Sequence, residues 1–361
     1  MDQDSRTGIR VSAPGRVCLF GEHSDYLGLD VIAAAIDMSI EIVAEPREDN
    51  SIHINYLDLN EVDEFSLNDE IQYRTRRDYV RSAFNVMARR GISPLHGWNL
   101  KVSGNLPIAA GLSSSSAMTV GAIEAVLAMS GEDLRPEDIA LRAYEAEVAE
   151  FGESGGTMDH FASSVGGIIH LNTRENKVTR LPAKLDAFVI GDSGEKKNTV
   201  EDLRYIKTTV EGEYEKLREL IGGFNRRTTP LSTAMQLNQE PQSKERLMAM
   251  ATLRNRDLTN RAVKLLSDPL PAPQELGNML REHHEILRDD LERSTPKIER
   301  MIAAAYDAGA LGCKINGSGG GGSMMAYTVG HEQEVAAAIG RTGAKTYVVK
   351  LGKGVTLTRV H

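Results

Sequence analysis

Residues 104–117 read Gly-Asn-Leu-Pro-Ile-Ala-Ala-Gly-Leu-Ser-Ser-Ser-Ser-Ala and lead into the apolar segment 118–129. The first half of this stretch is typical of a loop, and the second half is typical of a helix. Small residues let backbone N–H groups come close to an anion, and a helix N-terminus carries partial positive charge. The stretch therefore predicts a loop that cradles phosphate groups. The alternative is a flexible linker, or simple capping of the helix by Ser113.

A second glycine-rich stretch, residues 314–323, reads Lys-Ile-Asn-Gly-Ser-Gly-Gly-Gly-Gly-Ser. Its glycines match the spacing G-x-G-x-x-G, but a dinucleotide-binding fold places that motif after its first strand and at the start of a helix. Here the motif lies near the C-terminus, and the residues after it have the pattern of a strand. We therefore expect a hairpin whose bare backbone approaches a ligand, in preference to a nicotinamide site or a purely structural turn.

Polar residues interrupt two apolar strands at residues 14–26, which read Pro-Gly-Arg-Val-Cys-Leu-Phe-Gly-Glu-His-Ser-Asp-Tyr. The carboxylates of Glu22 and Asp25 can accept hydrogen bonds from the hydroxyl groups of a polyol. Arg16 can bind a phosphate or lower the pKa of a nearby acid. Taken alone, the segment could equally be a solvated turn with one ion pair.

A further acid, Asp159, follows a glycine-rich turn at residues 154–157. It either caps a helix or acts as a general base for a substrate hydroxyl. Glu147, on the preceding predicted helix, could complete a Mg²⁺ site with a serine hydroxyl. The adjacent His283 and His284 diverge by about 100° on a helix, so we expect surface or interface residues and no zinc pair.

The composition limits the partners. The 361 residues carry 42 Lys and Arg against 51 Asp and Glu, which gives a net charge of −9. An acidic chain without a long basic run is a poor candidate for binding nucleic acid or a membrane surface. We find no apolar stretch long enough to span a bilayer and no signal peptide. The two cysteines, Cys18 and Cys313, lie far apart, which favours a reducing, cytoplasmic setting over a disulfide framework.

The periodicity predicts an α+β fold with two lobes. The expected strands are residues 9–20, 31–45, 51–57, 98–102, 167–171, 186–191, 312–316, 323–328, 345–350 and 355–359. The expected helices include residues 76–90, 136–151 and 331–340, and Thr295-Pro296 has the pattern of a helix start. Long charged helices dominate residues 199–310. We therefore place the two lobes at residues 1–195 and 196–361.

The three stretches, taken in order, resemble the three motifs of the GHMP small-molecule kinases, and the resemblance covers nearly the whole chain. The first stretch is most similar to galactokinases, and so is Met158-Asp159-His160. Residues 287–290 and 294–296 also resemble a helix that is typical of galactokinases. Cys18, Ala33 and Ser116 depart from the galactokinase pattern. The sugar-contacting tyrosine of galactokinases has no clear match, although Asp202 and Tyr205 lie near its position.

The resemblance implies the two-lobed GHMP kinase fold, with an N-terminal ribosomal-protein-S5-like lobe and a C-terminal ferredoxin-like lobe. It also implies phosphoryl transfer from ATP, with Mg²⁺, to an alcohol group. The implied nucleotide-binding residues are Gly111, Leu112, Ser113, Ser114, Ser115, Ser116, Ala117, Gly319 and Gly320. The implied Mg²⁺ ligands are Ser115 and Glu147. Asp159 matches the base, and Arg16 the residue that orients it or stabilises developing charge on the phosphate. Both join Glu22, His23 and Asp25 around the sugar.

We therefore expect an ATP-dependent sugar kinase that acts on the anomeric hydroxyl of galactose or of a related monosaccharide. One alternative is a kinase of another small alcohol, such as mevalonate or a polyol. Another is a sensor that binds sugar and ATP without catalysis. The expected partner is a small-molecule sugar, and the expected state is a monomer or a homodimer.

Overall fold

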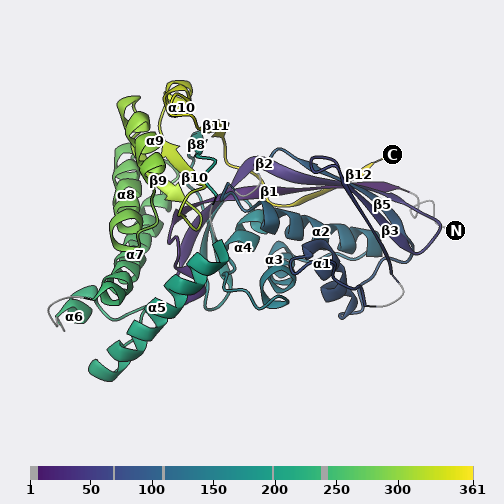
Figure 1. The fold of residues 1–361 in the computed structure, drawn as a ribbon, viewed down its shortest axis with the longest axis horizontal. Coiled ribbons are helices and arrows are strands. Elements are labelled where there is room, and N and C mark those ends of the chain that lie inside the picture. The colour runs from purple at the N-terminus through teal and green to yellow at the C-terminus, as the bar shows by residue number, and fades with distance from the viewer. Residues whose placement is uncertain (1–6, 68–69, 108–109, 197–198, 237–242, 361) are drawn as a thin grey trace.

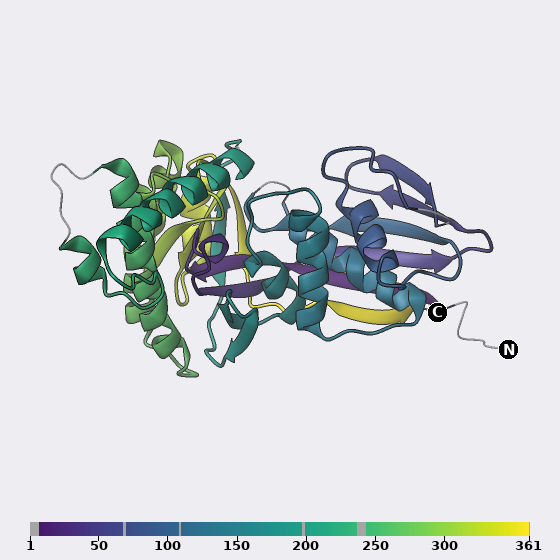
Figure 2. The same cartoon turned by 90° about the horizontal axis from the view of Figure 1, so that it is seen from below.

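The computed structural model describes residues 7–67, 70–107, 110–196, 199–236 and 243–360. The chain forms two lobes that lie end to end (Figures 1 and 2), each with its own β-sheet. This arrangement confirms the predicted two-lobed α+β fold. No helix in these ranges is long and apolar enough to cross a membrane.

The first lobe is built on an eight-stranded sheet with the order β12-β1-β2-β5-β3-β4, and β6 and β7 extend it beside β2. The strands are β1 (Gly8–Phe20), β2 (Val31–Pro46), β3 (Ser51–Tyr56), β4 (Glu61–Ser66), β5 (Trp98–Gly104), β6 (Ile168–Asn172), β7 (Lys177–Leu181) and β12 (Thr356–Val360). The sequence pattern did not predict β4 or β7. Both are mostly exposed strands that carry few buried apolar residues, so their alternation is weak.

Four helices cover one face of this sheet (Figure 1): α1 (Tyr79–Ala88), α2 (Ser114–Ser130), α3 (Pro136–Tyr144) and α4 (Met158–Val165). The central one is α2, which packs against both β1 and β2. A helix that is apolar on all sides must be buried on all sides. The consecutive residues Val120, Gly121, Ala122 and Ile123, which point to all sides of α2, are accordingly all buried.

The second lobe carries the four-stranded antiparallel sheet β11-β8-β10-β9. Its strands are β8 (Phe188–Asp192), β9 (Gly312–Asn316), β10 (Ser323–Tyr327) and β11 (Lys345–Val349). Its helices are α5 (Thr199–Leu220), α6 (Leu231–Met235), α7 (Lys244–Leu266), α8 (Pro273–Glu285), α9 (Pro296–Asp307) and α10 (Glu332–Gly340). The predicted division between the lobes at residue 195 stays a prediction. Two strands pair with strands from the other side of that division in the sequence. β8 joins the later strands, while β12 returns to pair with β1 (Figure 2).

Strand β1 carries the chain from the open sheet into the boundary between the lobes. Its first residues alternate between buried and exposed, but every residue from Ala13 to Phe20 is buried. The reason is that helices of both lobes pack against this end of the strand. The polar turn after β1 is therefore enclosed by both lobes.

His283 and His284 are expected to be surface or interface residues, and the surface alternative is wrong, because both side chains are buried within the chain. The ring of His283 stacks on Phe20, and its Nδ1 lies 3.1 Å from the carbonyl oxygen of Leu19. His284 instead contacts Glu299. Helix α8 packs against β9 and β1, so residues on two of its sides are covered. Cys18 and Cys313 are both free and buried, as expected for a chain without a disulfide framework.

Candidate active site

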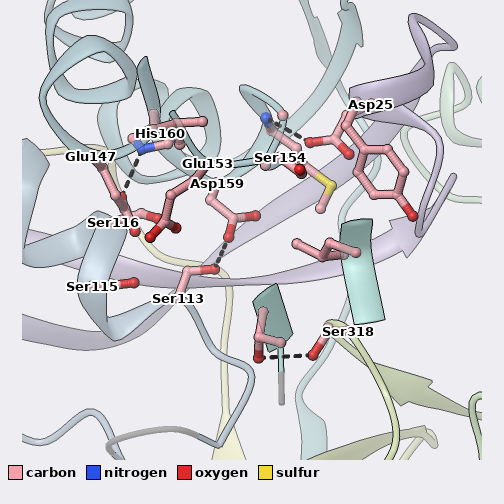
Figure 3. A pocket seen from close by; sticks show the side chains of 18 of the residues that line it. Asp25, Ser113, Ser115, Ser116, Glu147, Glu153, Ser154, Asp159, His160 and Ser318 are labelled. Carbon is pink, nitrogen blue, oxygen red and sulfur yellow. Dashed lines mark hydrogen bonds and ion pairs between the residues drawn. The ribbon is translucent and has the colours of Figure 1, made fainter. Parts of the chain in front are cut away.

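One cavity of about 490 Å³ lies at the boundary between the lobes (Figure 3). The end of β1, the starts of α2 and α4, the start of α5 and the β9–β10 turn all contribute to its wall. Every predicted residue of the acceptor site lines it: Arg16, Glu22, His23, Asp25 and Asp159. The fold thus brings together residues that are up to 143 positions apart in the chain.

Asp159 lies in the first turn of α4, where Arg16 and Ser113 hold its carboxylate. Arg16 donates two hydrogen bonds, from Nε to Oδ1 at 2.7 Å and from Nη2 to Oδ2 at 2.9 Å. The Ser113 hydroxyl donates to Oδ2 at 2.6 Å (Figure 3). Burial would raise the pKa of Asp159, but the Arg16 charge and the hydrogen bonds outweigh it and hold the pKa below its usual value. Asp159 is therefore ionised at neutral pH.

The predicted phosphate loop reaches the cavity through a tight backbone turn. Gly111 and Ser113 both have positive φ, +85° and +61°, and α2 begins at the next residue. Ser113 stands at the N-cap position, but its side chain makes no capping hydrogen bond, since it binds Asp159. A non-glycine residue in this conformation carries strain, which proteins tolerate mainly at functional sites. The capping alternative thus does not describe Ser113.

The other loop residues divide into two groups. Ser114, Ser115 and Ser116 line the cavity, and Figure 3 shows the last two. The side chains of Leu112 and Ala117 are instead buried in the core. Any contact of Leu112 or Ala117 with a nucleotide would therefore be made by the backbone. Ile108 and Ala109, which belong to the same sequence stretch, lie outside the described residues.

The turn after β1 supplies the second group of polar residues. The His23 backbone is also left-handed, with φ +63°, and its Nδ1 lies 2.7 Å from the Tyr26 hydroxyl. Its Nε2 is buried and has no hydrogen-bond partner among the described residues. Burial, helped by the charges of Arg293 and Lys314, lowers the pKa of His23 to about 4. His23 is therefore neutral at neutral pH.

Asp25 lies in the same turn, and its carboxylate forms no ion pair with a described residue. Its Oδ2 accepts a hydrogen bond from the backbone N–H of Met158 at 3.3 Å (Figure 3). Burial and the negative charge of Asp159 raise its pKa to about 6. Asp25 can thus change its charge within the physiological pH range.

Glu147 lies where helix α3 continues into a π-helical turn, Glu145–Ala149, a feature that is frequent at functional sites. His160 places its Nε2 2.8 Å from Glu147 Oε2, and Ser115 lies nearby in the same part of the cavity (Figure 3). Mg²⁺ prefers oxygen ligands and keeps waters and substrate phosphates in its shell. One carboxylate and one hydroxyl fit that requirement. The described residues contain no group of three or more His, Cys, Asp or Glu side chains that could hold a metal by themselves.

The second glycine-rich stretch forms the β9–β10 hairpin, as predicted, and its glycines lead into strand β10 and not directly into a helix. Gly317 and Ser318 line the cavity, but Gly319 and Gly320 do not, and their contact with a nucleotide stays a prediction. A Cβ on Gly319 would lie 2.6 Å from that of Arg293, so packing alone requires a glycine there. The two residues near the position of the galactokinase tyrosine do not line the cavity: Asp202 pairs with Arg293 at 2.8 Å, and Tyr205 is exposed. The residues of α5 that do line the cavity are Thr199, Val200 and Leu203.

Sequence reasoning did not identify several residues that form or support the site, among them His160 and Lys314. In the sequence, His160 stands out only as part of the galactokinase resemblance, and Lys314 only as the first residue of a glycine-rich stretch. Lys314 is fully buried, and its Nζ lies 2.9 Å from Glu22 Oε2. A lysine three residues before the first glycine of the turn is the only signal in the sequence, and it does not identify a partner almost 300 residues away.

Three family models match the chain. "GHMP kinases N terminal domain" matches residues 78–167, "GHMP kinases C terminal" matches residues 262–345, and "Galactokinase galactose-binding signature" matches residues 3–46. Among curated proteins, a mevalonate kinase of Pyrococcus furiosus is 31% identical over 96% of each chain. A galactokinase of Haemophilus influenzae is 29% identical over 88% of this chain and 84% of its own.

Solved structures show the same fold. The galactokinase of Lactococcus lactis in complex with galactose has a TM-score of 0.85 at 21% identity, and the match covers 97% of this chain and 95% of that one. The mevalonate kinase of Methanococcus jannaschii has a TM-score of 0.73 at 21% identity and covers 98% of this chain and all of its own. At such identities the likeness concerns the fold alone.

Proposed function

This chain belongs to the GHMP kinases, and on that premise we propose that it is an ATP-dependent sugar kinase that phosphorylates the anomeric hydroxyl of a monosaccharide. One observation carries the proposal: Glu22, His23 and Asp25 line the same cavity as Asp159 and the phosphate loop. These three residues lie within the segment that matches the galactose-binding signature. Several hydrogen-bonding groups on one turn suit an acceptor with several hydroxyls.

In this proposal Asp159 accepts the hydrogen bond of the reacting hydroxyl and so orients its oxygen towards the phosphorus atom. Its lowered pKa makes it a weak base. Phosphoryl transfer passes through a loose transition state, so little proton removal is needed before the oxygen–phosphorus bond forms. The proton then passes to Asp159 as ADP leaves. Arg16 holds the carboxylate in place by two hydrogen bonds throughout.

The start of α2 would receive the phosphates. Its backbone N–H groups have no side-chain cap among the described residues, and the helix end favours negative charge. Ser115 and Glu147 would hold Mg²⁺, with His160 fixing the carboxylate of Glu147. When bound, Mg²⁺ neutralises charge on the phosphate oxygens. The groups that would bind the phosphates thus lie in one local region of a protein whose net charge is −9.

A second candidate acceptor is mevalonate, because mevalonate kinases at 30–31% identity match over 96% of the chain. Measuring ADP release with a panel of monosaccharides, polyols and mevalonate separates the two. Turnover of a sugar, with ³¹P and ¹³C NMR locating the phosphate on the anomeric carbon, is the expected result. Turnover of mevalonate alone would replace the sugar assignment. Binding of a sugar without ADP release from any compound would indicate a sensor.

A further inference from the structure

One face of strand β9 points from the second lobe into the first. Residues two apart in a strand lie on the same face, so Lys314 and Asn316 point the same way. Asn316 Oδ1 accepts the backbone N–H of Cys18 at 3.0 Å, and its Nδ2 donates to the carbonyl oxygen of Gly111 at 2.8 Å. A strand of the second lobe therefore contacts both β1 and the phosphate loop.

Lys314 is the charged member of this face, and its side chain has no exposed surface. Its Nζ donates to Glu22 Oε2 and to the carbonyl oxygen of Cys18, each at 2.9 Å. A buried ammonium is costly unless it is paired and hydrogen-bonded, because it loses its hydration. The ammonium thus fixes the Glu22 carboxylate from behind.

The backbone of Glu22 is fixed from the second lobe as well. Asn255 on α7 donates from Nδ2 to the Glu22 carbonyl oxygen at 2.8 Å. Glu22 itself is only 3% exposed, yet it lines the cavity. One oxygen of its carboxylate is bound to Lys314, and the other has no hydrogen-bond partner among the described residues. Contacts from the second lobe thus hold both the backbone and the side chain of Glu22.

We propose that Lys314 is a positioning residue for the acceptor: it holds Glu22 so that the second carboxylate oxygen can accept a hydroxyl of the substrate. This proposal rests on the proposed kinase function and adds a specificity role for the second lobe. It implies that the acceptor site is complete only when β9 contacts the turn after β1. Phosphate binding uses other contacts and does not depend on this pair.

Lys314→Met tests the proposal because it removes the positive charge and keeps a long, unbranched side chain at this position. We expect the KM for the acceptor to rise ~10-fold or more, as for loss of a hydrogen bond to a charged group. The KM for ATP should stay within about twofold, since Lys314 is not among the residues that form the phosphate loop. Lys314→Arg, which keeps the charge, should recover part of the acceptor affinity.

A matched control separates positioning from stability. Arg246 and Glu213 form an ion pair at 3.0 Å, with Glu213 buried and Arg246 partly exposed, wholly within the second lobe and outside the cavity lining. Arg246→Met should lower the melting temperature without changing the acceptor KM. The double variant Glu22→Gln/Lys314→Met leaves no unpaired buried charge. It should recover stability relative to Lys314→Met while its acceptor KM stays high.

Two outcomes would overturn the proposal. One is a folded Lys314→Met protein with the wild-type acceptor KM. The other is an equal rise in the KM values for acceptor and ATP, which would indicate general support of the lobe boundary. If the wild type phosphorylates nothing in the panel, the kinase assignment fails by itself. Calorimetric titration of the sugar that binds would then compare wild type with Lys314→Met, and equal affinities would refute the role of Lys314.

Discussion

Two aspartates share the cavity, and their surroundings differ. Asp159 receives two hydrogen bonds from Arg16 and one from Ser113, and its pKa is lowered. Asp25 accepts a backbone N–H from Met158, has no cation among its described partners, and has its pKa raised to about 6. Burial raises the pKa of both groups. At Asp159 the Arg16 charge and the hydrogen bonds outweigh burial, whereas at Asp25 the negative charge of Asp159 adds to it.

This difference assigns separate tasks to the two carboxylates. Where the surroundings push the pKa values of two nearby acids apart, the acids can act in different protonation states. Asp159 keeps its charge across the physiological pH range and suits the reacting hydroxyl. Asp25 holds its charge only above about pH 6 and suits binding of the acceptor. The comparison predicts that changes at Asp159 affect kcat and changes at Asp25 affect KM.

The largest effect should come from Asp159→Asn. We expect kcat to fall by ~10³-fold, as for loss of a positioned acid–base group, while ATP still binds. Single-turnover kinetics and calorimetric titration of ATP measure the two quantities. Asp25→Asn, which makes the same change in the same cavity, is the control. Turnover within tenfold of wild type would remove Asp159 from its proposed role.

Asp25→Asn should raise the acceptor KM by ~10- to 100-fold, because an ionised hydrogen-bond acceptor is replaced by a neutral amide. We expect kcat to change much less, since the proposal places the reacting hydroxyl at Asp159 and not at Asp25. Initial rates over a range of acceptor concentrations give both constants. A loss of kcat as large as that of Asp159→Asn would erase the distinction between the two aspartates.

The sequence predicted the residue types of this site better than their environments. Arg16 and Asp159 stand in short, distinctive stretches, so both could be named. Their bidentate contact joins positions 143 residues apart, and no local pattern encodes it. The raised pKa of Asp25 also depends on neighbours from another helix. Charge state is a property of packing, so it became accessible only with the fold.

Local patterns also failed to predict which strands pair and which polar residues are buried, because both depend on residues far apart in the chain. Periodicity predicted that strands lie near residues 186–191 and 355–359, and both exist within two residues of those bounds. It could not indicate that β8 pairs with β10 or that β12 pairs with β1. Likewise, His283 and His284 have polar side chains that suggest exposure, and only their contacts with Leu19 and Glu299 show how burial is tolerated.

The raised pKa of Asp25 predicts a pH dependence for acceptor use. An acid with a pKa of about 6 is ionised above that pH and protonated below it, so hydrogen-bond acceptance is lost as the pH falls. We expect kcat/KM for the acceptor to drop ~10-fold between pH 7 and pH 5. His23, with its pKa of about 4, stays neutral over this range and should not contribute. In Asp25→Asn the profile should be flat; the same drop in that variant would assign the titration to another group.

The smallest effect should come from moving Asp25 without changing its charge. A Cβ on Gly156 would lie 2.1 Å from Asp25 Oδ2, so Gly156→Ala must displace the carboxylate. A Cβ on Gly155 would meet only Val148, at 3.5 Å, which is ordinary contact, and neither glycine has a positive φ. We expect Gly156→Ala to raise the acceptor KM ~3- to 10-fold, as for one weakened hydrogen bond, and Gly155→Ala to leave it unchanged. Because Asp159 keeps both its hydrogen bonds from Arg16, kcat should hold in both variants. Equal KM values for the two alanine variants would mean that the position of Asp25, unlike its charge, does not govern binding of the acceptor.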